Sequence, residues 1–202
     1  MSRGHTTELQ YIETSTTGLP NRKLAFWLFI ASECMFFGAL IATYMVYQGK
    51  SLVGPYPEEI LNIPLTTIST FVLLMSSLSM ALAVNASQRQ DIRGTRLALL
   101  ATIVMGLIFL GFQVYEFNHF YHAGLTLSRN LFGSSFFVLT GFHGAHVSVG
   151  VIWLIALLLH TFRPVIPERR ALDIEVAGLY WHFVDIVWIV IFALIYLLGV
   201  SH

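Results

Sequence analysis

LYWHFVDIVWIVIFALIYLLG, residues 179–199, is an almost uninterrupted apolar stretch near the end of the chain. A helix needs about 20 mostly apolar residues to cross the hydrocarbon of a bilayer. With its flanks, about 176–200, this stretch therefore predicts a transmembrane helix. Four earlier stretches meet the same requirement, at about 24–47, 65–86, 97–117 and 131–160. The sequence predicts an all-α polytopic membrane protein, a bundle of five transmembrane helices.

The composition supports a membrane protein. Of the 202 residues, 56% are hydrophobic and 11% charged, whereas soluble domains carry roughly 25% charged residues. The formal net charge is zero, so nothing indicates a nucleic-acid partner. The single cysteine, Cys34, excludes an internal disulfide and a thiolate-cluster metal site, and we interpret it as a packing residue.

The distribution of basic residues predicts the orientation. Residues 1–23 form a polar tail without the features of a cleaved signal, and we expect it to precede a single transmembrane domain over 24–200. The segments that join the predicted helices alternate between the two sides of the membrane and differ in charge. Those on one side contain only two basic residues, Lys50 and Arg129. By the positive-inside rule the N-terminus is cytoplasmic and the C-terminus periplasmic. The nine basic residues on the cytoplasmic side are Arg3, Arg22, Lys23, Arg89, Arg93, Arg96, Arg163, Arg169 and Arg170.

Polar residues within the apolar stretches are the candidate functional residues, because ionisable groups at membrane depth are costly. Two pairs are spaced three apart and share a helical face. If the first, fourth and fifth helices meet, Glu33 and these pairs form one buried polar cluster. The candidate buried, proton-related residues are Glu33, Glu116, His143, His146, His182 and Asp185.

Three interpretations of this cluster remain open. The groups can satisfy one another and hold the bundle together, with Glu33 neutral because burial disfavours a charged carboxylate. Alternatively, Glu33 exchanges or buffers protons, or the histidines and carboxylates bind a metal. The HExxH pattern, nucleotide-binding loops and nucleophile motifs are all absent. Haem ligation stays open on spacing alone, since His143, His146 and His182 could supply two axial ligands from facing helices.

Small residues at spacings of three and four predict close contacts between helices, since backbones approach most closely where side chains are small. The expected contact residues are Ser76, Ser79 and Ala83 on the second helix and Gly141, Ala145 and Ser148 on the fourth.

Four motifs resemble one known family. YWHFVDIVW, residues 180–188, resembles the signature of the third subunit of haem–copper terminal oxidases, and includes Tyr180, Trp181, Phe183 and Trp188. Segments similar to the same family occur in the same order along 24–199, and these are SECMFFGAL (32–40), GFQVYEF (111–117) and FFVLTGFHGAHVSVG (136–150).

The resemblance implies a non-catalytic subunit III of a proton-pumping terminal oxidase of aerobic respiration, with cytochrome c or quinol as electron donor. It implies direct packing on subunit I, which carries the haems and copper, and a role in proton uptake and in stability during oxygen reduction. It also implies that this chain itself has no catalytic, metal-binding or cofactor-binding residue. Subunit II, a small subunit IV and bound phospholipid are further implied partners, in a bacterial inner membrane. Glu33 takes the position of the family's carbodiimide-reactive glutamate.

The chain departs from the family's longer, seven-helix form, because two helices before residues 32–40 are missing; it resembles the five-helix bacterial form. The lipid cleft of the longer form therefore does not transfer. Alternative functions are a related five-helix subunit of a nitric-oxide reductase system, a free-standing proton carrier and a membrane metalloenzyme.

Overall fold

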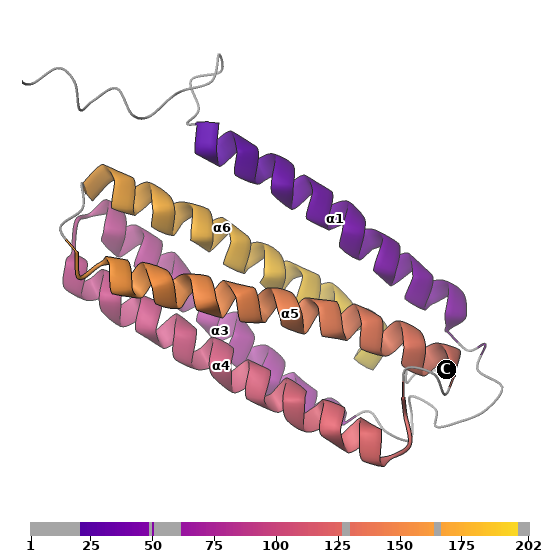
Figure 1. Ribbon diagram of the computed structural model, residues 1–202. Helices are drawn as coiled ribbons and strands as arrows, with labels where there is room; N and C mark the ends of the chain where they lie inside the picture. Colours follow the sequence, from indigo (N-terminus) through magenta and orange to yellow (C-terminus); the bar gives the residue numbers. More distant parts are fainter. Residues whose placement is uncertain (1–20, 49, 51–61, 127–129, 164–166, 198–202) are drawn as a thin grey trace, which may run out of the picture. The chain divides into compact units, whose positions relative to one another are not determined.

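The computed structural model describes residues 21–48, 50, 62–126, 130–163 and 167–197, and within these ranges it contains helices and no strand. The predicted polar tail, as far as residue 20, and the GPYP sequence of the first join lie outside the described residues. The helices are α1 (Asn21–Tyr47), α3 (Ile63–Gln88), α4 (Ile92–His122), α5 (Leu131–His160) and α6 (Pro167–Phe192), followed by a π-helical turn, η2 (Ala193–Leu197) (Figure 1).

All five helices are long and apolar enough to cross a membrane, which confirms the predicted all-helical, five-span architecture. Two of them extend well beyond their apolar centres. α6 begins at Pro167 instead of near residue 176, and α4 covers Ile92–His122 instead of about 97–117. The additional turns are polar, so hydropathy does not count them, although their backbone continues the helix.

Side-chain caps fix where three helices begin. Asn62, Asp91 and Asn130 each accept a hydrogen bond from the backbone N–H three residues later, at 3.2, 3.0 and 2.6 Å. Such caps satisfy N–H groups that have no partner within the helix. At the other end of α4, Gly124 has φ +85°, a left-handed conformation that glycine adopts without a Cβ penalty.

The chain divides into two compact units, residues 1–36 and 37–202. The second unit contains the C-terminal part of α1 and all the later helices. Within it, α3 contacts α4 and α6, and α5 also contacts α4 and α6, so these four helices form a closed bundle (Figure 1). α6 is the most enclosed, with 56% of its most apolar window buried against 33% for each of the other three.

The helices of this bundle pack around Trp181 of α6, whose ring we call the Trp181 wedge because it is inserted between two other helices. Its ring lies between α4 and α5 at two glycines: a Cβ added to Gly106 would be 2.7 Å from Cη2, and one added to Gly150 would be 3.0 Å from Cζ3. Lipid supplies little hydrophobic driving force between helices, so close packing and interhelical hydrogen bonds hold them together. Glycine at these two positions is what allows the contact.

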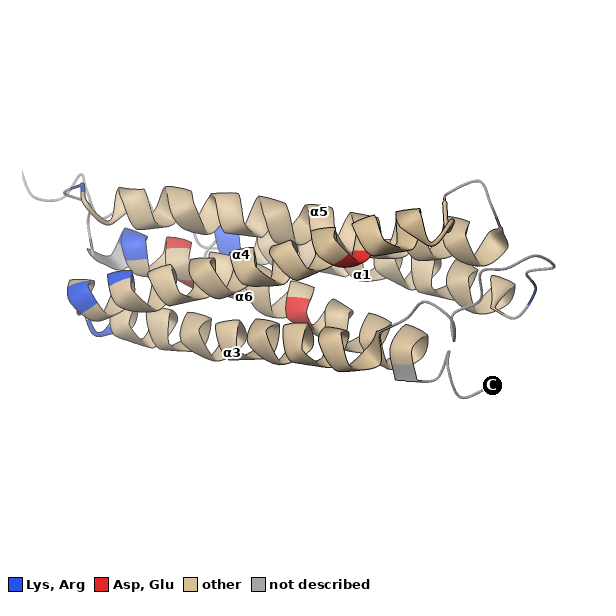
Figure 2. Cartoon of the chain, turned by 90° about the horizontal axis from the view of Figure 1, so that it is seen from below, with Lys and Arg blue, Asp and Glu red and all other residues tan. Residues whose placement is uncertain are grey.

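Basic residues gather at one end of the α3–α6 bundle, while most of the helical length carries no charge (Figure 2). At this end the Arg96 guanidinium of α4 caps α5, because Nε donates to Thr161 Oγ1 at 3.0 Å and Nη2 donates to the Thr161 carbonyl at 2.7 Å. The same guanidinium lies 4.0 Å from the centre of the Phe162 ring. These contacts satisfy a helix-end carbonyl that has no partner within α5.

Candidate functional site

Two tryptophans of the motif at 180–188 anchor α6 to α3. Trp181 Nε1 donates to Ser76 Oγ at 2.9 Å, and Trp188 Nε1 donates to Thr70 Oγ1 at 3.0 Å. Both indoles are almost fully buried. Each indole ring fills space in the core, and its N–H donates to a hydroxyl of α3. The two contacts together therefore determine the rotation of α6 about its axis and its position along that axis relative to α3.

His143 of α5 lies against Trp188. Its ring is stacked on the indole, with centroids 4.8 Å apart and planes at 27°. Phe109 of α4 packs edge-on against both rings, with centroid distances of 6.0 Å to His143 and 4.9 Å to Trp188. His143 is completely buried, and neither ring nitrogen has a hydrogen-bond partner among the described residues.

The other pair, His182 and Asp185, faces α3 and the bundle interior. Ser77 Oγ lies 2.6 Å from His182 Nδ1. Asp185 also lies close to Ser77, although neither of its carboxyl oxygens meets the geometry of a hydrogen bond with a described residue. Asp185 is 3% exposed, so its desolvation is nearly complete.

His146 points away from His143 despite sharing a broad helical face with it. Its Nδ1 lies 2.7 Å from the Phe142 carbonyl of its own helix, and its ring packs edge-on against Phe37 at 5.0 Å. The Tyr180 hydroxyl donates to the His146 carbonyl at 2.9 Å. Spacing of three therefore separates the two histidines into different environments.

Glu116 belongs to a second polar cluster, toward the end of α4. It is buried and accepts a short hydrogen bond from the Thr66 hydroxyl of α3. Tyr196, carried by the π-helical turn η2, lies beside both residues. Its ring stacks on Phe192 at 5.7 Å. The π-turn thus brings a hydroxyl-bearing ring to a carboxyl group that α4 holds inside the bundle.

Glu33 lies on α1 within the unit formed by residues 1–36. The other five predicted polar residues lie in the second unit, and the geometry above is that of the second unit alone. The role predicted for Glu33 stays a prediction. Cys34, next to it, is a free and exposed cysteine.

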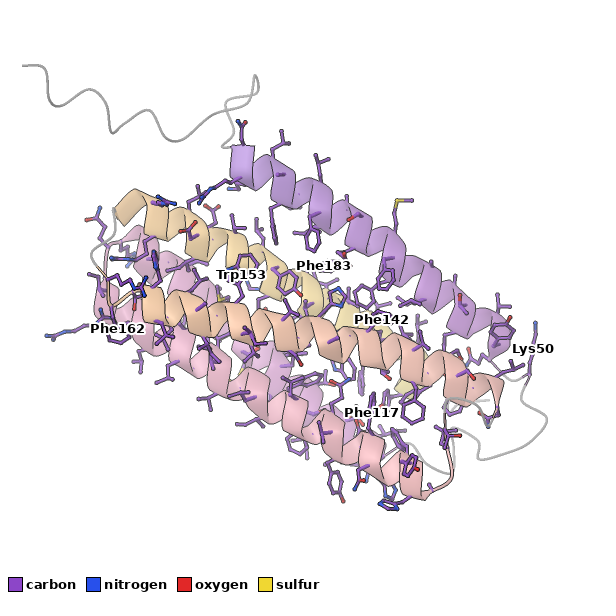
Figure 3. All side chains as sticks on the ribbon, in the orientation of Figure 1. Lys50, Phe117, Phe142, Trp153, Phe162 and Phe183 are labelled. Carbon is purple, nitrogen blue, oxygen red and sulfur yellow. The ribbon has the colours of Figure 1, made fainter. Side chains whose placement is uncertain are left out.

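Aromatic rings surround the polar groups of the second unit. Phe183, another of the four signature residues, is buried, and its ring packs edge-on against Phe37 with the ring centroids 6.2 Å apart. Phe117 of α4 packs on Phe136 and Phe137 of α5, with centroids 6.4 and 5.2 Å apart (Figure 3). Dense packing of this kind holds the polar side chains in single positions.

The small-residue contact predicted on α5 is wrong. A Cβ added to Gly141 would meet nothing within 4 Å, and Ala145 is exposed. The close approaches instead use Gly144, against Gln113, and Gly150, against Trp181. Spacing identifies residues that share a face but does not determine which face meets a neighbouring helix. On α3, by contrast, Ser76 and Ala83 are buried as expected.

Several polar residues of the interior were not among the sequence candidates. Gln113 precedes Glu116 by three positions in the motif at 111–117, and this spacing signals a shared face. The hydroxyls of Thr66, Thr70 and Ser77 recur along α3 at spacings of four and seven. Tyr196 carried no such signal, because the π-turn changes the helical phase after Phe192.

The fold and these buried groups define a multi-pass membrane protein whose helices are joined by an aromatic core with polar groups inside it. In the part of the chain that the structure describes, no group of three or more His, Cys, Asp or Glu side chains is arranged to hold a metal ion.

The model of the family "Cytochrome c oxidase subunit III" matches residues 5–200, and the chain belongs to this family. This confirms the resemblance seen in the motifs. The probable quinol oxidase subunit 3 of Staphylococcus saprophyticus is 38% identical over 178 residues, 88% of this chain and 89% of the relative. The quinol oxidase subunit 3 of Bacillus subtilis is 37% identical over 178 residues, 88% and 87% of the two chains.

A third relative, the cytochrome c oxidase subunit 3 of Alkalihalophilus pseudofirmus, is 38% identical over 192 residues, 94% of this chain and 92% of the relative. The chain is accordingly a subunit III of a terminal oxidase, a part of an oxygen-reducing complex.

Proposed function

We propose that this chain is the non-catalytic subunit III of a proton-pumping haem–copper oxidase, and that it supports proton uptake and the stability of the complex during oxygen reduction. The observation that carries the proposal is the set of ionisable side chains held inside a membrane bundle. Glu116, His143 and Asp185 are buried there, and such groups are retained at membrane depth mainly where they have a function.

The complex lies in a bacterial inner membrane, with the N-terminus of this chain in the cytoplasm and the C-terminus outside. Residues 24–200 act as one five-helix transmembrane domain behind the polar tail. The support is the distribution of charge: the α3–α4 turn, the end of α5 and the start of α6 are basic, and they meet at one end of the bundle (Figure 2). Cytoplasmic ends of membrane helices carry this excess of Lys and Arg.

The redox chemistry belongs to the partners. Subunit I, against which this chain packs, holds the haems and copper, and subunit II and a small subunit IV complete the complex. Phospholipid fills the remaining contacts with the bilayer. The described residues expose many large apolar side chains, including Phe142 of α5 and Phe162 just after its end (Figure 3), and such surfaces suit both lipid chains and another membrane subunit.

The test compares the complex purified with and without this chain. A tag on the chain should recover haem absorbance and a large subunit with copper-ligand histidines. Without the chain, the haem spectrum and the initial oxygen consumption should persist, but activity should decay faster during turnover. Assays with reduced cytochrome c and with quinol identify the donor. Recovery of the chain alone and colourless would refute the oxidase role, and an unchanged turnover lifetime would refute the supporting role.

Glu33 provides a finer test of proton uptake. Glu33→Gln keeps the size and hydrogen-bonding capacity of the side chain but cannot release a proton. It should leave assembly intact and shorten the activity lifetime, while Glu33→Asp, which keeps a carboxyl group, should preserve most of that lifetime. Equal behaviour of the two variants would show that Glu33 acts only in packing.

The orientation is tested by fusing alkaline phosphatase, which folds only outside the cytoplasm, to the C-terminus of the chain. The proposed topology predicts active enzyme. A second fusion in the turn between α3 and α4, after Gln90, is the matched control and should be inactive. The reverse pattern would overturn the orientation.

A further inference from the structure

Buried polar side-chain atoms of the second unit without a hydrogen-bond partner among the described residues include both ring nitrogens of His143, both carboxyl oxygens of Asp185 and Oε1 of Gln113. The three side chains are 0%, 3% and 6% exposed. A buried polar atom without a partner costs about 1–3 kcal/mol, so three such residues in one bundle require an explanation.

Trp188 and Phe109 fix the place of His143. The His143 ring is stacked on the Trp188 indole at 4.8 Å, and Phe109 of α4 closes the other side, with its ring edge-on to both His143 and Trp188. The unpartnered nitrogens of His143 therefore lie among α4, α5 and α6. Asp185, three positions before Trp188 on α6, lies instead beside Ser77 of α3.

Gln113 adds an acceptor at the same α4–α5 contact. Its Nε2 donates to the Thr140 carbonyl at 2.8 Å, and this bond determines which end of the amide is oxygen. A Cβ added to Gly144 would lie 2.7 Å from Gln113 Oε1, so the oxygen rests on the backbone next to His143. The unpartnered oxygen of Gln113, which α4 carries, thus lies against the turn of α5 that carries His143.

The indole donors near this contact are already used. Trp188 Nε1 donates to Thr70, and Trp181 Nε1 donates to Ser76. The unpartnered atoms are an acceptor, Gln113 Oε1, and the two nitrogens of the His143 imidazole, which in its neutral form has one donor and one acceptor. A small ligand that both donates and accepts matches this set.

We propose that bound water occupies the interior of the α4–α5–α6 contact beside Trp188, hydrogen-bonded to His143 and Gln113. Buried water commonly satisfies polar groups that the protein leaves unpaired, with about three hydrogen bonds per molecule. The water belongs to this chain and not to a subunit interface, because all its partners lie in the second unit. The proposal rests on this geometry and is independent of the role in the oxidase.

Radiolytic footprinting of the purified complex tests the proposal. A short X-ray pulse converts water to hydroxyl radicals, which oxidise the side chains next to bound water, and mass spectrometry of peptides gives the rate at each residue. Trp181 is the internal control, because it is as buried as Trp188 but is wedged between two glycines with its N–H bonded. Trp188 and His143 should be oxidised at least several-fold faster than Trp181.

Two variants remove the proposed ligands of the water. His143→Phe preserves a ring against Trp188 without nitrogen atoms, and Gln113→Met removes one acceptor from a side chain of similar size. Either should lower oxidation at Trp188 toward the rate at Trp181. The second variant keeps the test decisive if the first does not assemble.

Rapid mixing with heavy-oxygen water before the pulse separates bound water from bulk water. Bound water exchanges slowly, so oxygen added at Trp188 immediately after mixing should still be light. Protection of Trp188 and His143 equal to that of Trp181 would overturn the proposal. Immediate heavy-oxygen labelling would overturn it as well, since it would show solvent entering from the surface.

Discussion

Gly106→Ala tests whether the Trp181 wedge is what closes the bundle. The added methyl group would lie 2.7 Å from Cη2 and 3.1 Å from Cζ2 of Trp181, and 3.1 Å from Val151 Cγ2. The indole has no room to move away, because Gly150 contacts its opposite edge and Ser76 holds its nitrogen. The methyl group must therefore separate α4 from α6.

The expected cost combines three terms. Overpacking a tight core costs about 1–3 kcal/mol, and distorting the hydrogen bond to Ser76 adds about 1 kcal/mol. Alanine returns roughly 0.5–1 kcal/mol through its better helix propensity. The net destabilisation should be about 1–3 kcal/mol. Gly111→Ala on the same helix is the matched control, since its Cβ would meet nothing within 4 Å, and it should be neutral or slightly stabilising.

The measurement is the unfolding of the full-length chain in mild detergent, titrated with a denaturing detergent and followed by tryptophan fluorescence. Gly106→Ala should lower the midpoint clearly, whereas Gly111→Ala should leave it unchanged or raise it. Equal midpoints for the two variants would refute the wedge, because propensity alone treats both positions alike.

Three other substitutions can be measured by the same titration. Arg96→Lys should cost about 1 kcal/mol, because an ammonium cannot reproduce the two hydrogen bonds from the guanidinium to Thr161; wild-type stability would contradict the capping role. Gln90→Gly should stabilise by about 0.5–1 kcal/mol, since Gln90 has φ 60° and glycine adopts this conformation without strain; a loss would count against that reasoning. Thr66→Val should destabilise by about 1–3 kcal/mol, because it removes the Thr66 hydroxyl that donates to Glu116 and leaves Tyr196 as the remaining hydroxyl beside that carboxyl group. Thr66→Ser should restore most of the stability, so similar losses in both would point to packing instead.

The helices themselves could be predicted from the sequence, because each segment in a membrane has to satisfy the hydrogen-bonding groups of its own backbone. The fourth helix, predicted at about 131–160, is observed at Leu131–His160. The start of α6 was placed too late, since hydropathy reports the apolar centre of a helix and not its polar first turns. The motif at 180–188 was equally informative, and its two tryptophans are the residues that anchor α6.

The candidate site could be predicted only in part from the sequence. The polar residues could be identified because ionisable groups are conspicuous in apolar stretches, but the sequence did not show which of them lie together. A spacing of three suggested that His143 and His146 act together, yet one ring is stacked on Trp188 and the other packs on Phe37. Residues three apart differ by about 60° around a helix, and that angle is enough to place them against different neighbours.

The sequence by itself determined that the chain has five helices long and apolar enough to cross a membrane, which residues are unusually polar for such helices, and which family it belongs to. These follow from transfer free energies and motifs, both of which are properties of short segments. Only the tertiary structure decided that Gly106 and Gly150 receive Trp181, that a π-turn carries Tyr196 to Glu116, and that polar atoms of His143, Gln113 and Asp185 are buried without a hydrogen-bond partner among the described residues. The physical reason is that packing and hydrogen bonding depend on the rotation and height of each helix against its neighbours, and no single segment encodes either.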